Sequence, residues 1–333
     1  MAEILNLSIS TVSKSLLGHS DIGESTKKKV LELAKKMNYS PNLFGKGLRT
    51  QKTMSIGVII PNITIHYSSL ILKGIIETAK LSGYRVIISE SGHHHQDEKD
   101  AINTLINSNV DGILLSIARE SHDIEHILEA SNFIPIVLFD KVSTKIPLTK
   151  IIDDDEFGAE TAVRHLIAQG RSKIVLIREK CKTSNSENRF RGYTRALTKA
   201  GIVIDDNLIR ECDSMSIDDG YTVMETLLQE KVEFDGVFGA TDNVAIGAIQ
   251  AMKKFGITIP RDVSVIGFSN SKNCTIIEPN LTTIEQPGYN IGKYAIKYLL
   301  EEILEDSDIS TNRTIELKTK LIIRESSTFE ILK

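Results

Sequence analysis

Short apolar runs recur along the chain from residue 55 onward, and amphipathic segments of helix length separate them. Each run is nearly continuous, which is typical of strands buried on both faces. Strands that alternate with helices favour a parallel sheet with crossover helices, because parallel neighbours need a long connection. We therefore predict an α/β architecture, with strands at 55–60, 84–89, 112–116 and 135–139.

A second set of apolar runs follows the three aspartates at 153–155, and it lies at 173–177, 236–240 and 263–268. Two such sets in succession predict two similar lobes. The cleft between two lobes of this kind is the default place for a ligand. A chain of 333 residues also fits roughly two to three domains better than a single core.

The first fifty residues have a different texture, that of short helices joined by tight turns. Residues 1–5 predict a brief helix, and Ser8 is placed to cap a second helix over 9–17 that ends at Gly18. A helix, a turn and a second helix form the helix-turn-helix outline. The sequence thus predicts a small all-α head before the α/β body.

A third helix over 26–37 is predicted by its apolar spacing, with one face made of Val30, Leu33, Ala34 and Met37. This face would cover the first two helices. The helix should stop before Pro41, because a residue that precedes proline avoids the helical region.

Charge is distributed unevenly along the chain. Residues 1–52 carry nine Lys/Arg and four Asp/Glu, so this segment is +5 and the other 281 residues are −9 within a total of −4. A basic segment on an acidic body is expected when one end meets phosphate. On charge alone, a solvated helical face fits this pattern equally well.

Composition indicates a globular protein, with 41% hydrophobic and 25% charged residues. No apolar run reaches the roughly 18 residues that span a bilayer, and the first residues lack the order of a secretory signal. We expect a cytoplasmic protein with no membrane partner. Its three widely spaced cysteines, Cys181, Cys212 and Cys274, fit neither a disulfide framework nor a metal-ligand spacing.

Several motifs together resemble the lactose-repressor (LacI/GalR) family, and they cover nearly the whole chain. They are the segments 7–18, 39–42, 48–50, 56–63, 110–113, 137–140, 191–193, 242–247, 260–268 and 281–287. The resemblance implies a head at 1–40 and a hinge at 41–53. It also implies a periplasmic-binding-protein-like body, with an N-terminal lobe of 54–153 and 284–312 and a C-terminal lobe of 154–283 and 313–333.

The resemblance and the physical argument agree on the start of the second helix, which would enter the major groove. Ile9, Ser10 and Lys14 are the candidate base readers, while Thr11 and Ser13 are placed to hold phosphates. Ile9 would meet a thymine methyl and Lys14 a guanine edge. The alternative is that Ile9 belongs to the core and Lys14 is simply solvated.

The hinge segment resembles the one with which this family levers a leucine into the minor groove. Leu48 matches that leucine, Asn42 is a further candidate DNA contact, and Gly45 and Gly47 weaken any helix there. A flexible linker with an incidental leucine is the alternative. Relatives begin several residues before Met1, so we expect a truncated first helix and a doubt over DNA affinity.

In the body, the resemblance places a polar effector between the lobes. Arg189 matches an arginine that hydrogen-bonds the effector, and Asp140 and Asp242 lie at strand ends that face the cleft. The alternative is that both aspartates only cap helices. Three positions depart from the family, because Thr241 replaces an asparagine, Ser214 an aromatic ring and Ser269 an aspartate.

These departures prevent a transfer of the effector's identity, although Tyr67, beside His66, is a candidate replacement ring. The consecutive histidines at 93–95 cannot easily converge on one ion, so we expect no metal. We find no motif of a nucleophile, phosphate loop or cofactor site, and we predict no catalytic residue and no cofactor.

The combined expectation is a transcriptional repressor. A homodimer would bind a pseudo-palindromic site in double-stranded DNA, controlled by a small polar effector that is carbohydrate-related. The alternative is a cytosolic sugar-binding protein that does not bind DNA. A periplasmic binding protein would instead need an export signal and no basic head.

Overall fold

The computed structural model describes residues 1–333 apart from 17, 38, 40–51, 305–311 and 329–333. It forms two compact units, residues 1–54 and residues 55–333, and each is described by itself. The candidate DNA contacts Asn42 and Leu48, and most of the predicted hinge at 41–53, lie outside the described residues.

The first unit contains α1 (Ala2–Leu5), α2 (Ile9–Leu16) and α3 (Glu24–Lys36). The amide of Thr11 donates to Ser8 Oγ at 3.0 Å, so the predicted cap of α2 is confirmed. The chain leaves α2 through Gly18, whose φ of 75° suits glycine. A short turn joins α1 to α2 in the predicted helix-turn-helix outline, and α3 packs against α2.

Burial inside this unit matches the predicted pattern only in part. Val12 on α2 and Val30 and Ala34 on α3 are buried, but Met37 is 49% exposed. The helix α3 begins at Glu24 rather than Thr26, because Gly23 has the extended backbone of a capping residue. The apolar face of α3 is therefore narrower than we predicted.

The second unit contains two six-stranded sheets, which confirms the α/β class. The first sheet has the order β11-β5-β4-β3-β1-β2 and the second has β12-β10-β9-β8-β6-β7. The strands of the first are β1 (Ser55–Ile60), β2 (Arg85–Glu90), β3 (Gly112–Leu115), β4 (Ile136–Phe139), β5 (Lys150–Asp153) and β11 (Thr314–Leu317). Those of the second are β6 (Ile174–Glu179), β7 (Ile209–Cys212), β8 (Gly236–Gly239), β9 (Ser264–Phe268), β10 (Thr282–Glu285) and β12 (Lys320–Ile322).

Within the described ranges, the strand pairs are parallel except β10 with β12, as the crossover argument predicts. One strand departs from the expected burial on both faces. The strand β2 lies at the edge of its sheet and exposes Ile87 and Ile88. An edge strand has a neighbour on one side only, so its outer side chains remain accessible.

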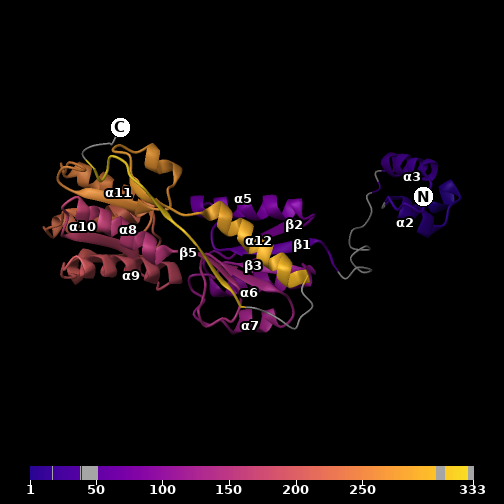
Figure 1. The fold of residues 1–333 in the computed structure, drawn as a ribbon, viewed down its shortest axis with the longest axis horizontal. Helices are drawn as coiled ribbons and strands as arrows, with labels where there is room; N and C mark the ends of the chain where they lie inside the picture. The colour runs from indigo at the N-terminus through magenta and orange to yellow at the C-terminus, as the bar shows by residue number, and fades with distance from the viewer. Residues whose placement is uncertain (17, 38, 40–51, 305–311, 329–333) are drawn as a thin grey trace. The chain divides into compact units, whose positions relative to one another are not determined.

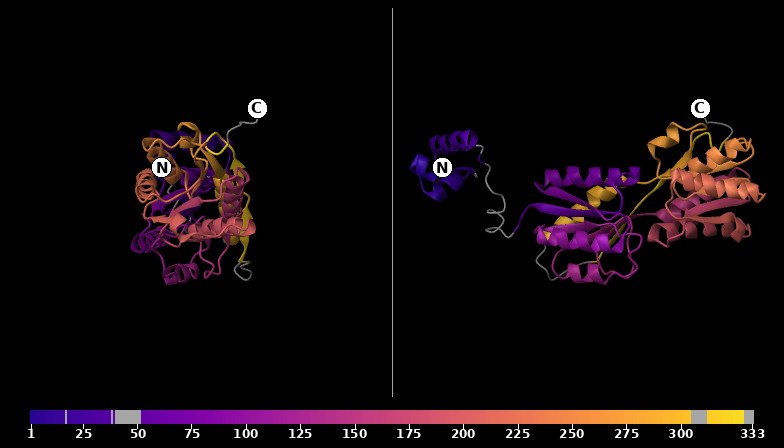
Figure 2. Two further views of the ribbon diagram at one scale, coloured as in Figure 1. Left: turned by 90° about the vertical axis from the view of Figure 1, so that its left-hand side faces the viewer. Right: turned by 180° about the vertical axis from the view of Figure 1, so that it is seen from behind.

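Helices cover both faces of each sheet (Figure 1, Figure 2). In the first lobe, α5 (His66–Leu81) and α12 (Gly288–Leu304) cover one face, and α6 (His95–Asn107) and α7 (Glu125–Ser131) the other. In the second lobe, α10 (Ile217–Gln229) and α11 (Asp242–Lys254) lie opposite α8 (Asp155–Ala168) and α9 (Ser184–Lys199).

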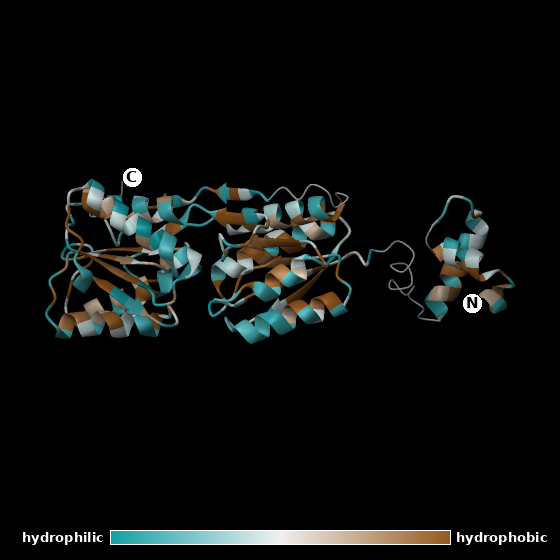
Figure 3. Cartoon of the chain, turned by 90° about the horizontal axis from the view of Figure 1, so that it is seen from below, coloured by the Kyte–Doolittle hydropathy of each residue, from teal (hydrophilic) through white to brown (hydrophobic). Residues whose placement is uncertain are grey.

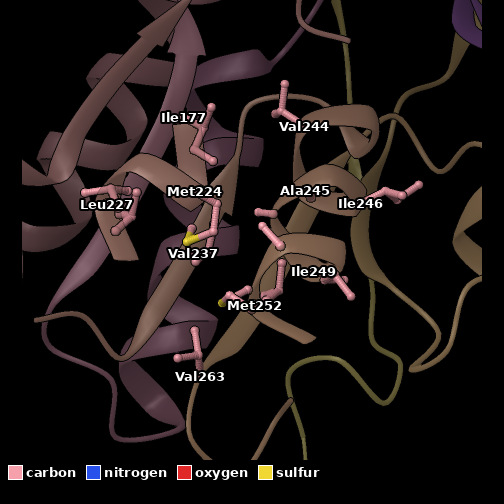
Figure 4. Packing of buried hydrophobic residues seen from close by; sticks show 14 of the residues in the cluster. Ile177, Met224, Leu227, Val237, Val244, Ala245, Ile246, Ile249, Met252 and Val263 are labelled. Carbon is pink, nitrogen blue, oxygen red and sulfur yellow. The ribbon is translucent and has the colours of Figure 1, made fainter. Parts of the chain in front are cut away.

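Hydrophobic side chains gather on the strands and on the helix faces that meet them (Figure 3). The core between the second sheet and the α10/α11 pair illustrates this packing (Figure 4). Its largest buried members include Ile177, Met224, Leu227, Val237, Ile249 and Met252. Burial of such a core supplies the main driving force for folding the lobe.

The chain crosses between the lobes three times, at 153–155, 285–288 and 317–320. The strand pairings move two of the expected lobe boundaries. The strand β10 pairs with β9, so residues 284 and 285 belong to the second sheet, and β11 pairs with β5, so residues 314–317 belong to the first. Both strands are short and half polar, so no apolar run marks them.

The described part of the chain contains no helix that is both long and apolar enough to cross a membrane.

Candidate functional site

The first turn of α2 presents its polar and apolar candidates to solvent. Ile9 is 81% exposed, and Ser10 and Ser13 are exposed as well, while Val12 and Ser15 on the opposite side are buried. The alternative that Ile9 belongs to the core is therefore wrong. An apolar side chain so exposed at the start of a helix is available to a partner surface.

The remaining candidates on α2 have partners within the head. Thr11 is half-buried and its hydroxyl lies 2.8 Å from Ser8 Oγ. Lys14 Nζ lies 2.5 Å from Asp21 Oδ2, and this hydrogen bond lowers the pKa of Asp21. Asp21 follows Gly18 in the turn after α2, so the glycine turn brings the carboxylate back to the helix. Lys14 is thus an exposed side chain with a partner, which the sequence did not indicate.

In the body, Arg189 lies buried where α8 and α9 meet the strand ends of the second sheet. It is only 8% exposed, its Nε donates to Asp155 Oδ1 at 2.7 Å and its Nη1 to the carbonyl of Ala240 at 2.7 Å. Its guanidinium carbon lies 3.9 Å from the ring centre of Phe268. The helices α8 and α9 therefore fix this arginine at the strand ends of the second sheet.

A second buried carboxylate, Asp153, belongs to the same group. It accepts hydrogen bonds on Oδ2 from Tyr67 at 2.9 Å and from Gln286 at 2.7 Å. Burial raises the pKa of Asp153 and of Asp155, and in both cases Arg189 opposes that effect. Burial and the Asp153 charge also raise the pKa of Tyr67, whose hydroxyl stays protonated as a donor.

Asp140 completes this group from the first lobe, just after β4. Its backbone has a φ of 58°, and Asn185 Nδ2 on α9 donates to its Oδ1 at 2.8 Å. Ser116 donates to the other oxygen at 3.3 Å. Asp140 is therefore not a helix cap, and its carboxylate joins the two lobes at the cleft.

Asp242 plays a different part. It is 2% exposed, and its two oxygens accept hydrogen bonds from Thr283 Oγ1 at 2.5 Å and from the amide of Ser271 at 2.6 Å. Thr241 caps α11 by accepting from the amide of Val244. Asp242 thus ties the start of α11 to the segments at 271 and 283, while Thr241 stabilises the first turn of the helix.

The remaining predicted positions are dispersed. Ser214 is exposed and donates to Asp219 Oδ2, within the capping box of α10. Ser269 has a φ of 118° and donates to Gln286 Oε1 at 2.7 Å, so it reaches the cleft group through that glutamine. The ring of Tyr67 packs against Gly288, and its hydroxyl is the group that joins the buried cluster through Asp153.

The structure brings four further residues to the cleft, Asp153, Asp155, Asn185 and Gln286. In the sequence, the run of aspartates at 153–155 marked only the boundary between the two sets of strands. These acids could have been recognised as site residues, because they lie where the chain passes from one lobe to the other. A segment at such a crossing lies beside both lobes and therefore beside any site between them. No comparable signal pointed to Asn185 or Gln286.

The consecutive histidines have separate environments. His94 Nδ1 lies 2.9 Å from Glu120 Oε2, and His95 packs edge-on against His126 with ring centres 4.6 Å apart. Among the described residues, no group of three or more His, Cys, Asp or Glu side chains is placed to hold a metal ion.

Comparison with known proteins agrees with this arrangement. Residues 2–42 match the bacterial regulatory proteins of the lacI family, and residues 163–327 match a periplasmic binding protein-like domain. Catabolite control protein A of Priestia megaterium is 31% identical over 324 residues, which is 96% of this chain and 97% of that protein. The transcriptional repressor CytR of Escherichia coli K12 is 32% identical over 96% of this chain and 93% of its own.

Solved structures of similar fold also include transcription regulators. The lac repressor dimer bound to operator and the anti-inducer ONPF has a TM-score of 0.87 and 25% identity, covering 98% of this chain and 97% of its own. A regulator from Enterococcus faecium with bound ribose has a TM-score of 0.73 and 26% identity, covering 82% of this chain and 98% of its own. The named relatives are transcription regulators, and this chain belongs to the LacI family of DNA-binding transcriptional repressors and regulators.

Proposed function

We propose that a homodimer of this protein binds a pseudo-palindromic operator through α2 and represses transcription in the cytoplasm. We also propose that a small polar effector of the carbohydrate type binds between the lobes and controls this activity. The observation that carries the first part is the exposure of Ile9, Ser10, Ser13 and Lys14 on one side of a helix whose other side is buried. Such a helix start offers both apolar and charged contacts to base edges.

The cleft group supports the proposed effector. Asp140, Asp153, Asp155, Asn185 and Arg189 come from both lobes and offer several donors and acceptors within one buried region. Dense, convergent polar groups suit a polyhydroxylated molecule, since each hydroxyl can both donate and accept. Relatives support this choice, because one has bound ribose and another is named a ribose operon repressor.

Asp242, Thr241, Ser214 and Ser269 have a supporting role in this proposal. Their side chains are engaged within the second lobe or with Gln286. They would position the residues that contact the effector.

The proposed dimer uses the edge of the first sheet and the outer side of α5. Ile87 and Ile88 on β2 and Ile76 and Leu81 on α5 are exposed apolar residues on neighbouring elements. Apolar groups of this kind are typical of an interface core. The buried side of α12 packs against α5 and the sheet, so only its outer side is open to a partner.

The test is selection of bound sequences from a random DNA pool at two salt concentrations, with the protein alone and with added ribose or other simple sugars. We expect the selection to enrich a palindromic sequence, and we expect one of the sugars to change the affinity of the protein for that sequence. Binding that has no sequence preference and falls steeply with salt would point instead to a non-specific basic head.

A further inference from the structure

Arg119 lies in the loop after β3 in the first lobe, yet its hydrogen bonds reach the second lobe. Its Nη2 lies 2.6 Å from Glu179 Oε1, and its Nη1 donates to the carbonyl of Asp213 at 2.6 Å. Cys181 Sγ donates in turn to the carbonyl of Arg119 at 3.3 Å. Both the side chain and the backbone of this one residue are therefore tied across the seam between the lobes.

The two acceptors are brought together by neighbouring strands. Glu179 is the last residue of β6 and is paired in register with Cys212, the last residue of β7, so Asp213 follows directly beside it. Thr183 Oγ1 donates to the other oxygen of Glu179 at 2.9 Å. The carboxylate is thus held at the strand ends that border the cleft.

The loop that carries Arg119 is equally well held on its own side. Glu98 is fully buried, and it accepts from the amide of Ala118 at 2.5 Å and from Ser121 Oγ at 2.7 Å, so it is bonded on both sides of Arg119. His126 Nε2 lies 3.0 Å from the same carboxylate. This buried network lies outside the proposed effector site. It fixes the loop that carries Arg119.

Burial distinguishes this pair from an ordinary surface ion pair. The side chains of Arg119 and Glu179 are 20% and 10% exposed. Exposed pairs contribute little, whereas loss of one partner from a desolvated pair leaves the other charge buried and unpaired. Two further hydrogen bonds cross the same seam, from the amide of Val142 to Ser184 Oγ at 3.2 Å and from Asn185 Nδ2 to Asp140 Oδ1 at 2.8 Å.

We propose that Arg119 is an interlobe positioning residue, which holds the strand-end loops of the two lobes at the spacing that this structure shows. The buried carboxylate of Glu98 orients its loop, and Glu179 and the Asp213 carbonyl receive its guanidinium. The spacing of the cleft, and hence its fit to any effector, depends on this contact. Its importance for regulation rests on the proposed effector control, but the seam can be measured without effector or DNA.

The test is amide hydrogen exchange, followed by mass spectrometry, on the full chain and on Arg119→Gln. We expect exchange about thirtyfold or more faster in segments 140–143 and 179–185, which is the effect of truncating one partner of a buried charged pair. The strands β1 and β6 should keep their protection, because the lobes separate locally without unfolding. Arg195→Gln is the matched control, since Arg195 pairs with Glu156 and Glu160 inside the second lobe.

A double-mutant cycle separates a positioning role from general damage. Glu179→Gln should reproduce most of the effect, and the double variant should exchange about as fast as Arg119→Gln, because both substitutions break the same Arg119–Glu179 pair. Unchanged exchange at the seam in Arg119→Gln overturns the proposal. So does faster exchange spread evenly over both sheets, or strictly additive effects in the double variant.

Discussion

Arg189 Nε donates to Asp155 Oδ1 across 2.7 Å, and both side chains are buried. The residue proposed to contact the effector is therefore also the main partner of a buried carboxylate. Binding and stability are coupled at this position, so a simple truncation of Arg189 reports on both.

We expect Arg189→Ala to destabilise the second lobe by about 3–5 kcal/mol, because it leaves Asp155 buried and unpaired. Urea denaturation measures this loss. Arg191→Ala is the control, since Arg191 is an exposed neighbour on α9 that pairs with Glu156, and it should cost less than about 1 kcal/mol. Equal losses in the two variants would contradict the structural role of Arg189.

Lys14→Ala should relax the base preference of the operator at one position per half-site. A side chain that contacts a guanine edge contributes about 1–3 kcal/mol of discrimination. Asp21→Asn is the matched control, because it removes the partner of Lys14 and leaves the ammonium in place. DNA selected by Lys14→Ala should show no base preference at one position of each half-site, whereas DNA selected by Asp21→Asn should keep that preference. If both variants select the same sequence, Lys14 does not contact a base.

We expect the free energy of unfolding to decrease at acidic pH because of His93. Burial, with help from Lys141 and Arg119, lowers the pKa of His93 from 6.5 to about 3. The folded state therefore takes up this proton later than the unfolded chain, so its stability is complete above pH 6.5 and is lost as the pH falls toward 3. The slope is at most about 1.4 kcal/mol per pH unit, and partial exposure reduces it.

His93→Asn should flatten this slope, and asparagine tolerates the φ of 69° at this position. The midpoint of urea denaturation between pH 5 and pH 7 measures the change. His122→Asn, at an exposed position in the same lobe, should leave the slope as it is. An unchanged slope in His93→Asn would show that other groups cause the acid sensitivity.

Gly247→Ala tests the close contact between α10 and α11. A Cβ at this position would collide with the carbonyl oxygen of Ile217 and the amide of Tyr221. We expect a cost of about 1–3 kcal/mol, which is typical of overpacking, although alanine favours the helix. Gln250→Ala, exposed on the same helix, should be neutral, and thermal unfolding compares the two.

The sequence predicted the strands that are continuous apolar runs, and it predicted that these strands form two similar lobes. It did not predict β5, β7, β10, β11 and β12, because each is three or four residues long and carries polar side chains. Such strands form because a sheet edge is already present for them to pair with. That is a property of the assembled lobe, and local sequence does not record it.

For the candidate site, single motifs identified Arg189 and Asp140, and the run at 153–155 was the overlooked signal. The pairing of Lys14 with Asp21 depends on the path of the turn through Gly18. The reach of Arg119 to Glu179 depends on how two separate lobes meet. Contacts between elements distant in the chain follow from tertiary packing, so residue types and spacings do not reveal them.

Because the chain crosses between the lobes three times, neither sheet is complete until the last segment of the chain has been synthesised. The first sheet receives its last strand, β11, only when residues 314–317 have been made, long after its other five strands. Until then the outer edge of β5 has no neighbour from its own sheet and offers unpaired backbone groups to other chains. Premature termination near residue 310 would therefore leave a nearly whole protein with an open, aggregation-prone edge.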